Sequence, residues 1–140
     1  MSDLLTIAGR VELGRRRRSD ASLQASSESA AWGRVPRVAR LMALAIRFDE
    51  LLAAGSVRNY AQLARLGHVT RARITQIMNL RALAPEIQEA LLFMQRLQRG
   101  RDPIHLAQLQ PIARQPLWSR QRELWQQLVV TTHSPQPQDR

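Results

Sequence analysis

Apolar side chains recur at helical spacing through the middle of the chain. Between Val38 and Leu52 they fall mostly three or four residues apart, which places them on one face of a helix. Pro36 suits the first turn of such a helix, and Gly55 suits the position that follows its last turn. The pattern therefore predicts a long amphipathic helix from about residue 36 to residue 54.

Two short helices are predicted next from their capping residues. Asn59 can cap the first of them, and Gln62, three residues later, would complete a capping box. Thr70 can cap the second, which we expect to run to about Leu80. Only three residues separate the two helices, so they must cross steeply and pack closely.

Three further helices are expected in the second half of the chain. Pro85 favours the start of one, because proline suits the first helical position. The pair Asp102-Pro103 predicts the start of another, which Pro111 should kink or shorten. The last should span about residues 117–129. We therefore predict an all-α fold: a helix-turn-helix bundle of about six helices with a flexible basic N-terminal arm.

The two ends of the chain differ in composition from the middle. Residues 1–35 are expected to form a basic arm or linker, with a short strand at 5–13 where apolar and polar residues alternate. Residues 36–99 are interpreted as the helix-turn-helix core and 100–130 as a C-terminal helical extension. The two prolines in 131–140 favour a disordered tail.

The chain is strongly basic, with a formal net charge of +10, and all 21 of its basic residues are arginine. Such an excess favours a polyanionic partner, either nucleic acid or an anionic membrane surface. No long apolar run or signal-peptide pattern is present, which argues against the membrane, and we expect a cytoplasmic, nucleoid-associated protein. Cysteine is absent, which excludes disulfides and thiolate metal sites. We expect no cofactor and no metal.

The segment from residue 59 to residue 81 is typical of a pair of helices that reads DNA. Leu63 and Ala64 can form the inner face of its first helix, Val69 can fill the turn, and Ile74 and Ile77 can form the inner face of its second helix. The remaining residues of the second helix then face outward. They are Thr70, Arg71, Ala72, Thr75, Gln76 and Asn79.

These outward residues have the chemistry of base recognition. Arginine can pair with guanine, glutamine or asparagine can pair with adenine, and a threonine methyl can pack on thymine. The same segment contains four arginines and no acidic residue, whereas a helix selected only for solubility normally mixes both signs. Besides Arg71, the other three arginines of the segment are therefore also expected to bind DNA. They are Arg65, Arg73 and Arg81.

One feature of the turn departs from the usual motif. Many helix-turn-helix proteins place glycine just before the buried turn residue, where a left-handed backbone is needed. Here that position is His68, and Gly67 lies one residue earlier. Histidine tolerates the left-handed region better than most residues, and Gly67 can absorb the strain, so we expect the motif to survive.

The stretch from Leu63 to Leu80, followed by Leu83-Ala84-Pro85-Glu86-Ile87, resembles the helix-turn-helix and trailing helix of partition proteins of the ParB/KorB type. It is also similar to small helix-turn-helix proteins encoded beside site-specific recombinases on mobile elements. The resemblance covers about residues 34–128. It implies that Thr70, Arg71, Ala72, Thr75 and Gln76 face the major groove, but it implies no nucleotide-binding domain, and we expect no enzymatic activity.

Other surfaces leave alternatives open. The run Arg15, Arg16, Arg17 and Arg18 can follow phosphates or enter a minor groove, or it can be a basic arm with only non-specific attraction. The stripe formed by Arg37, Arg40 and Arg47 can be a solvated face or a phosphate contact. Trp118 and Trp125 share a helix face that can be core, a homodimer seam or a partner surface.

The sequence thus predicts a sequence-specific protein that binds double-stranded DNA, acting in transcription regulation or as an accessory factor of a mobile element. We expect a homodimer, because one small module reads only a short site. A recombinase is a further expected partner. The alternative is an adaptor that docks on a recombinase or nuclease through its C-terminal helices, and an RNA-binding module is a third candidate.

Overall fold

The computed structural model describes residues 33–133 of the chain, and over this range it is built from helices, with no strand. A single β-bridge joins Arg34 to Leu97. The prediction of an all-α fold with about six helices is confirmed, whereas the expected strand at 5–13 lies outside the described residues. In chain order the elements are α3 (Arg37–Ala53), α4 (Tyr60–Gly67), α5 (Arg71–Met78), the 3-10 helix η1 (Asn79–Ala82), α6 (Pro85–Leu92), α7 (Leu106–Ala113) and α8 (Trp118–His133).

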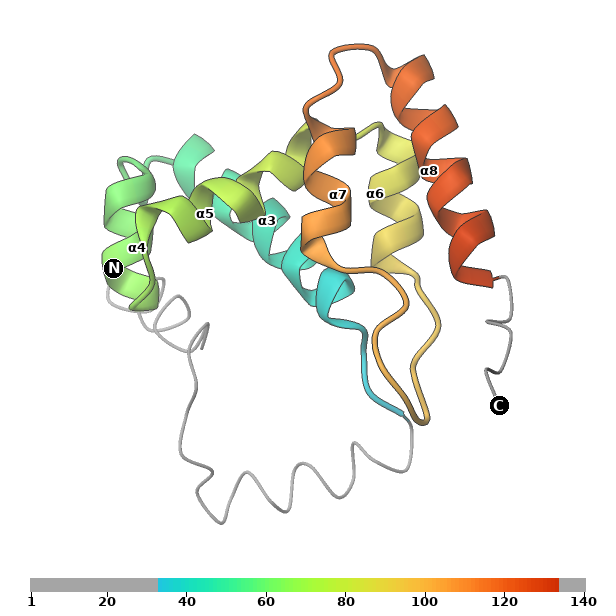
Figure 1. The fold of residues 1–140 in the computed structure, drawn as a ribbon. Coiled ribbons are helices and arrows are strands. Elements are labelled where there is room, and N and C mark those ends of the chain that lie inside the picture. Colours follow the sequence, from blue (N-terminus) through green and yellow to red (C-terminus); the bar gives the residue numbers. More distant parts are fainter. Residues whose placement is uncertain (1–32, 134–140) are drawn as a thin grey trace.

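The long helix α3 organises the core. It contacts α5, η1 and α6, and Figure 1 shows it running behind α5. Its buried side chains recur every three or four residues, as the sequence predicts. The buried set is Val38, Ala39, Leu41, Met42, Ala45, Phe48 and Leu51.

The helices after residue 100 belong to the same core. Leu109, Ile112 and Ala113 of α7 are buried in the cluster that α3 and α5 form. Helix α8 lies outside this cluster and packs Leu124, Trp125 and Leu128 against it with half-buried side chains. In Figure 1, α6, α7 and α8 stand side by side at one end of the molecule, and α4 and α5 occupy the other.

The predicted start of α7 is wrong by one turn. The helix begins at Leu106, and Asp102 lies in the connection before it. Its carboxylate instead accepts a hydrogen bond from the guanidinium of Arg34, which also donates to the carbonyl of Gly100. A carboxylate that can cap a helix is equally able to pair with an arginine, and here Asp102 pairs with the distant Arg34 and does not cap α7.

The predicted end of α8 is also wrong. The helix continues to His133, so residues 131–133 are helical and not part of a tail. The hydroxyls of Thr131 and Thr132 donate to backbone carbonyls of the preceding turn, which satisfies these polar groups inside the helix.

Gln121 joins three segments near the start of α8. Its side chain is buried, its carbonyl oxygen accepts from the Ala84 amide at 2.7 Å, and its amide nitrogen donates to the carbonyls of Ala82 and Gln115. Every polar atom of this side chain is therefore paired, as burial requires. The sequence reasoning missed this residue.

None of the helices between residues 33 and 133 is both long enough and apolar enough to cross a bilayer.

Candidate nucleic-acid interface

The pair α4 and α5 begins with side-chain caps at both helices. Asn59 accepts a hydrogen bond from the Gln62 amide at 2.9 Å, and Thr70 accepts one from the Arg73 amide at 3.1 Å. Both caps are as predicted. The capping box is modified, however, because the Gln62 side chain accepts from the amide of Arg58 and not from that of Asn59.

His68 occupies the left-handed position of the turn, with φ 52° and ψ 43°. Gly67 remains the last residue of α4 and does not take the strained conformation, so the strain falls on His68 itself. Val69 follows, is half-buried, and donates from its amide to the Ala64 carbonyl at 3.0 Å. This left-handed residue lets the chain reverse over only three residues.

The inner face of the pair lies in the core as predicted. Ile74 and Ile77 are both 0% exposed, and Leu63 and Ala64 of α4 are buried beside them. Because these apolar side chains fix the rotation of α5 about its axis, the opposite face of the helix must point away from the core.

That opposite face is exposed. Thr70, Arg71, Ala72, Thr75 and Gln76 are all exposed. The hydroxyl of Thr70 is engaged in the cap, and that of Thr75 donates to the Arg71 carbonyl at 3.1 Å. The side chains of Arg71 and Gln76 are exposed and make no hydrogen bond or ion pair within the described range, so their polar groups face solvent.

Two predicted site residues are turned to intramolecular contacts. Asn79 was expected to face outward, but it is half-buried and its amide donates to Gln110 of α7 at 2.9 Å. Arg81 pairs with Asp49 of α3 at 2.9 Å and donates to Gln88 at 2.8 Å. The contacts of Asn79 with Gln110 and of Arg81 with Asp49 join positions 31 and 32 residues apart, which the local pattern cannot reveal.

The remaining predicted arginines are placed differently from one another. Arg65 is exposed on α4 and has no acidic partner among residues 33–133. Arg73 is half-buried and turned toward α3, where burial and the nearby Arg37 lower its pKa. Arg15, Arg16, Arg17 and Arg18 lie outside the described residues.

The arginines predicted on α3 also divide. Arg47 pairs with Glu50 on its own helix at 3.2 Å, which is a solvated-face contact. Arg40 is exposed, and Arg37 lines a hollow together with Arg73. The three arginines therefore have different surroundings and do not form one continuous basic surface.

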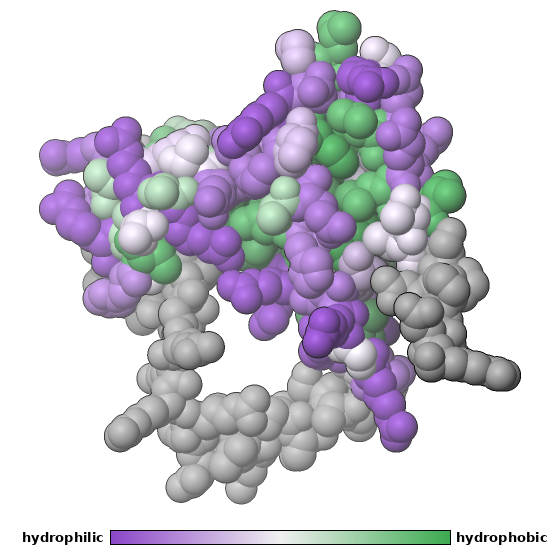
Figure 2. Space-filling model, viewed as in Figure 1, coloured by the Kyte–Doolittle hydropathy of each residue, from purple (hydrophilic) through white to green (hydrophobic). Residues whose placement is uncertain are grey.

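Charge is distributed unevenly over the described residues, which contain fifteen arginines and six acidic residues. Five of the acids form ion pairs, with Arg34, Arg47, Arg81, Arg120 and Arg122. Helices α4 and α5 contain no acid at all. Figure 2 shows the consequence for polarity: the α4–α5 end is largely hydrophilic, whereas apolar side chains gather between α7 and α8.

Within the described part of the chain, no group of three histidine or acidic side chains is placed to hold a metal ion. Comparison of the chain with protein-family models, with curated proteins and with solved structures found no significant match. The function must therefore be argued from the geometry of this surface.

Proposed function

We propose that this chain binds double-stranded DNA in a sequence-specific manner and that α5 is the helix that enters the major groove. The observation that carries the proposal is the two-sided character of α5. One side holds Ile74 and Ile77 in the core, and the other presents Arg71 and Gln76 with unpaired polar groups on a helix pair that contains no acid.

Each exposed residue has a role in this proposal. Arg71 and Gln76 offer the two bidentate chemistries that distinguish guanine and adenine in the major groove. Thr75, with its hydroxyl already bonded to the helix backbone, has its methyl group available for thymine. The first amides of α5 and the exposed Arg65 are suited to backbone phosphates, which position the helix without specifying sequence.

The proposed biological role is that of a transcription regulator or an accessory factor of a mobile element, in keeping with the resemblance to ParB/KorB-type proteins. A single α5 reads only a short site. We therefore include a homodimer on a palindromic or repeated site in the proposal.

The test is selection of bound fragments from random duplex DNA at fixed salt, followed by affinity measurements on the enriched site. Arg71→Ala and Gln76→Ala should each cost about 1–3 kcal/mol in binding and relax one base position. Arg114→Ala and Gln126→Ala are matched controls outside α5, where the same side-chain types are exposed, and they should leave the sequence preference unchanged. Selection that enriches no sequence would refute the proposal.

A second candidate function is that of an adaptor for a recombinase or nuclease. Leu117 and Trp118, at the start of α8, are 65% and 49% exposed, and two adjacent exposed apolar side chains suit a protein contact there. A partner that remains bound at high salt, combined with equal affinity for all DNA sequences, would favour the adaptor. Tighter binding to duplex RNA than to duplex DNA would instead favour an RNA-binding module.

A further inference from the structure

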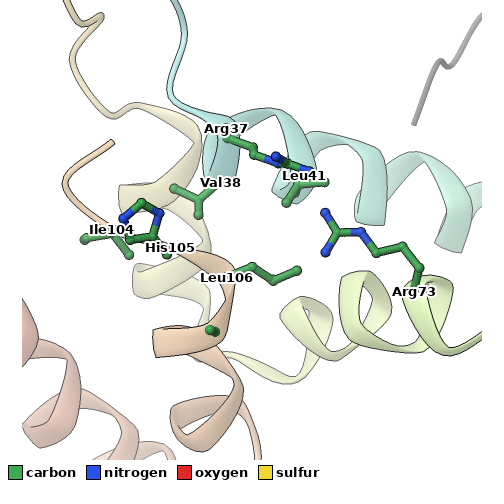
Figure 3. Close-up of a pocket in the computed structure, with 8 residues that line it drawn as sticks. Arg37, Val38, Leu41, Arg73, Ile104, His105 and Leu106 are labelled. Atoms are coloured by element: carbon green, nitrogen blue, oxygen red, sulfur yellow. The ribbon is translucent and has the colours of Figure 1, made fainter. Parts of the chain in front are cut away.

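A hollow of about 280 Å³ lies where α3, α5 and the start of α7 meet. Figure 3 shows the side chains around it: Val38 and Leu41 come from α3, and Ile104 and Leu106 from the approach to α7 and its first residue. A water molecule's share of liquid volume is roughly 30 Å³, so the hollow has room for a group of several heavy atoms.

Two arginines face each other across this hollow. Arg37 reaches into it from α3 and Arg73 from α5, and in Figure 3 their guanidinium groups point toward one another. Neither side chain forms a hydrogen bond or an ion pair with anything in residues 33–133. Their proximity is unfavourable as it stands, and the pKa of Arg73 is lowered first by burial and then by the charge of Arg37.

No acidic residue lines the hollow. Asp102 accepts from the backbone amide of Arg37 at 3.4 Å, but its carboxylate already forms an ion pair with Arg34. The side chain of Asp102 is only 12% exposed, which leaves it little room to serve a second arginine.

The first turn of α7 forms another side of the hollow. His105, Leu106 and Ala107 all line it, and the N–H groups in the first turn of a helix have no partner inside the helix. The amide of His105 is taken by the Gln108 side chain. The next two amides, with the positive end of the helix dipole, add to the positive potential that the two arginines create.

We infer that this hollow is a binding site for one phosphate group, held between Arg37 and Arg73 beside the start of α7. Two guanidinium groups from different helices can grip separate oxygens of one phosphate, and the anion would remove the repulsion between them. The assignment of that phosphate to a DNA backbone rests on the proposed function. Arg73 projects from the same helix as Arg71 and Gln76, so the phosphate would belong to a strand bordering the groove that α5 enters.

The first experiment measures duplex DNA affinity at several salt concentrations for the full chain and for Arg37→Gln, Arg73→Gln and the double variant. Loss of a charge-assisted contact to one phosphate should weaken binding by about tenfold or more, equally on all sequences. The magnitude of the slope of log affinity against log salt should fall by about one in the double variant. Arg114→Gln, at the far end of α7, is the control and should keep the wild-type slope.

The second experiment uses inorganic phosphate and no DNA. The Tm of the wild-type chain should rise in phosphate compared with chloride of equal ionic strength, and the double variant should lose this rise. Because both substitutions remove a repulsive charge, the variant should remain folded in chloride, which circular dichroism can verify.

The two experiments separate the two proposals. Sequence-specific DNA binding that is sensitive to Arg71→Ala, with wild-type behaviour of the double variant in both experiments, would overturn the phosphate site and leave the proposed function intact. Failure of the wild-type chain to bind any duplex, with a phosphate-dependent Tm that requires Arg37 and Arg73, would support the site as one for free phosphate and refute the proposed function.

Discussion

The two ends of the molecule use arginine in opposite ways. At the α6–α8 end, Arg120 and Arg122 each pair with a glutamate, at 2.6 and 2.8 Å. At the α4–α5 end, Arg65, Arg71 and Arg73 have no acidic partner in the part of the chain that the structure describes. Arg120 and Arg122 therefore have their charges paired within residues 33–133, whereas Arg65, Arg71 and Arg73 do not.

This difference teaches which arginines to associate with a partner. An exposed ion pair contributes little stability, but it does neutralise a charge and holds a guanidinium in place. Unpaired arginines on an acid-free helix leave a positive potential directed at solvent, and this potential attracts polyanions. The exposed face of α5 is thus a better candidate for a nucleic-acid interface than the more apolar surface around α8.

The largest expected effect concerns how deeply the apolar side chains of α5 and α8 are buried. Ile77 is fully buried on the inner face of α5. Ile77→Ala should therefore lower the free energy of unfolding by about 3–4 kcal/mol, as measured by urea denaturation. Leu128 of α8 is only half-buried, and Leu128→Ala should cost less than about 2 kcal/mol. Equal costs would contradict the placement of the core beneath α5.

Gln121 provides the next largest effect, at the α8 end. Gln121→Leu removes three hydrogen bonds and leaves the amide of Ala84 without its buried acceptor, which should cost about 2–3 kcal/mol. Denaturant unfolding measures the loss. The sequence preference of DNA binding should not change, because Gln121 lies far from the α5 face. If the variant were as stable as wild type, the three hydrogen bonds of Gln121 would contribute nothing to the stability of the fold.

A smaller effect of opposite sign is expected at the α4–α5 turn. His68→Gly should raise the free energy of unfolding by about 1 kcal/mol, because glycine adopts the left-handed conformation without the steric cost of a side chain. Gly67→Ala is the comparison variant. It should also raise the free energy of unfolding, but for a different reason, because Gly67 is helical and alanine favours a helix. If His68→Gly destabilised the protein, the histidine side chain would have a role that its exposed position does not indicate.

The smallest effect concerns the ion pair at the α8 end. The backbone amide of Glu86 at the start of α6, and then Arg122, lower the pKa of the Glu86 carboxyl. A lowered pKa in the folded state means that the charged form stabilises the fold at neutral pH and that this contribution is lost as the pH falls through the folded pKa. Glu86→Gln should therefore be slightly less stable than wild type at neutral pH and equally stable in acid.

High salt should shrink the small difference at neutral pH, because the group is exposed. A difference that instead grows toward acid pH would contradict the direction of the shift.

The sequence predicts what depends on neighbours along the chain. The caps at Asn59 and Thr70 and the burial of Ile74 and Ile77 follow from spacing, since each is decided within one or two turns of helix. This local information also fixes which side chains of α5 face away from the core.

What the sequence did not predict depends on distant segments. Asn79 is partly covered because α7, thirty-one positions later, brings Gln110 beside it. Asp102 is taken by Arg34 across sixty-eight positions, and Gln121 satisfies backbone groups that no local pattern marks as needing a partner. The hollow between Arg37 and Arg73 likewise exists only once three helices are packed together.

The most direct measurement is a titration of the isotope-labelled chain with its selected duplex, followed by the backbone amide signals in NMR. The proposal predicts the largest shifts at residues 70–76, with the amides of α8 nearly unchanged. Shifts confined to α8, with the amides of Arg71 and Gln76 unchanged at saturation, would contradict it.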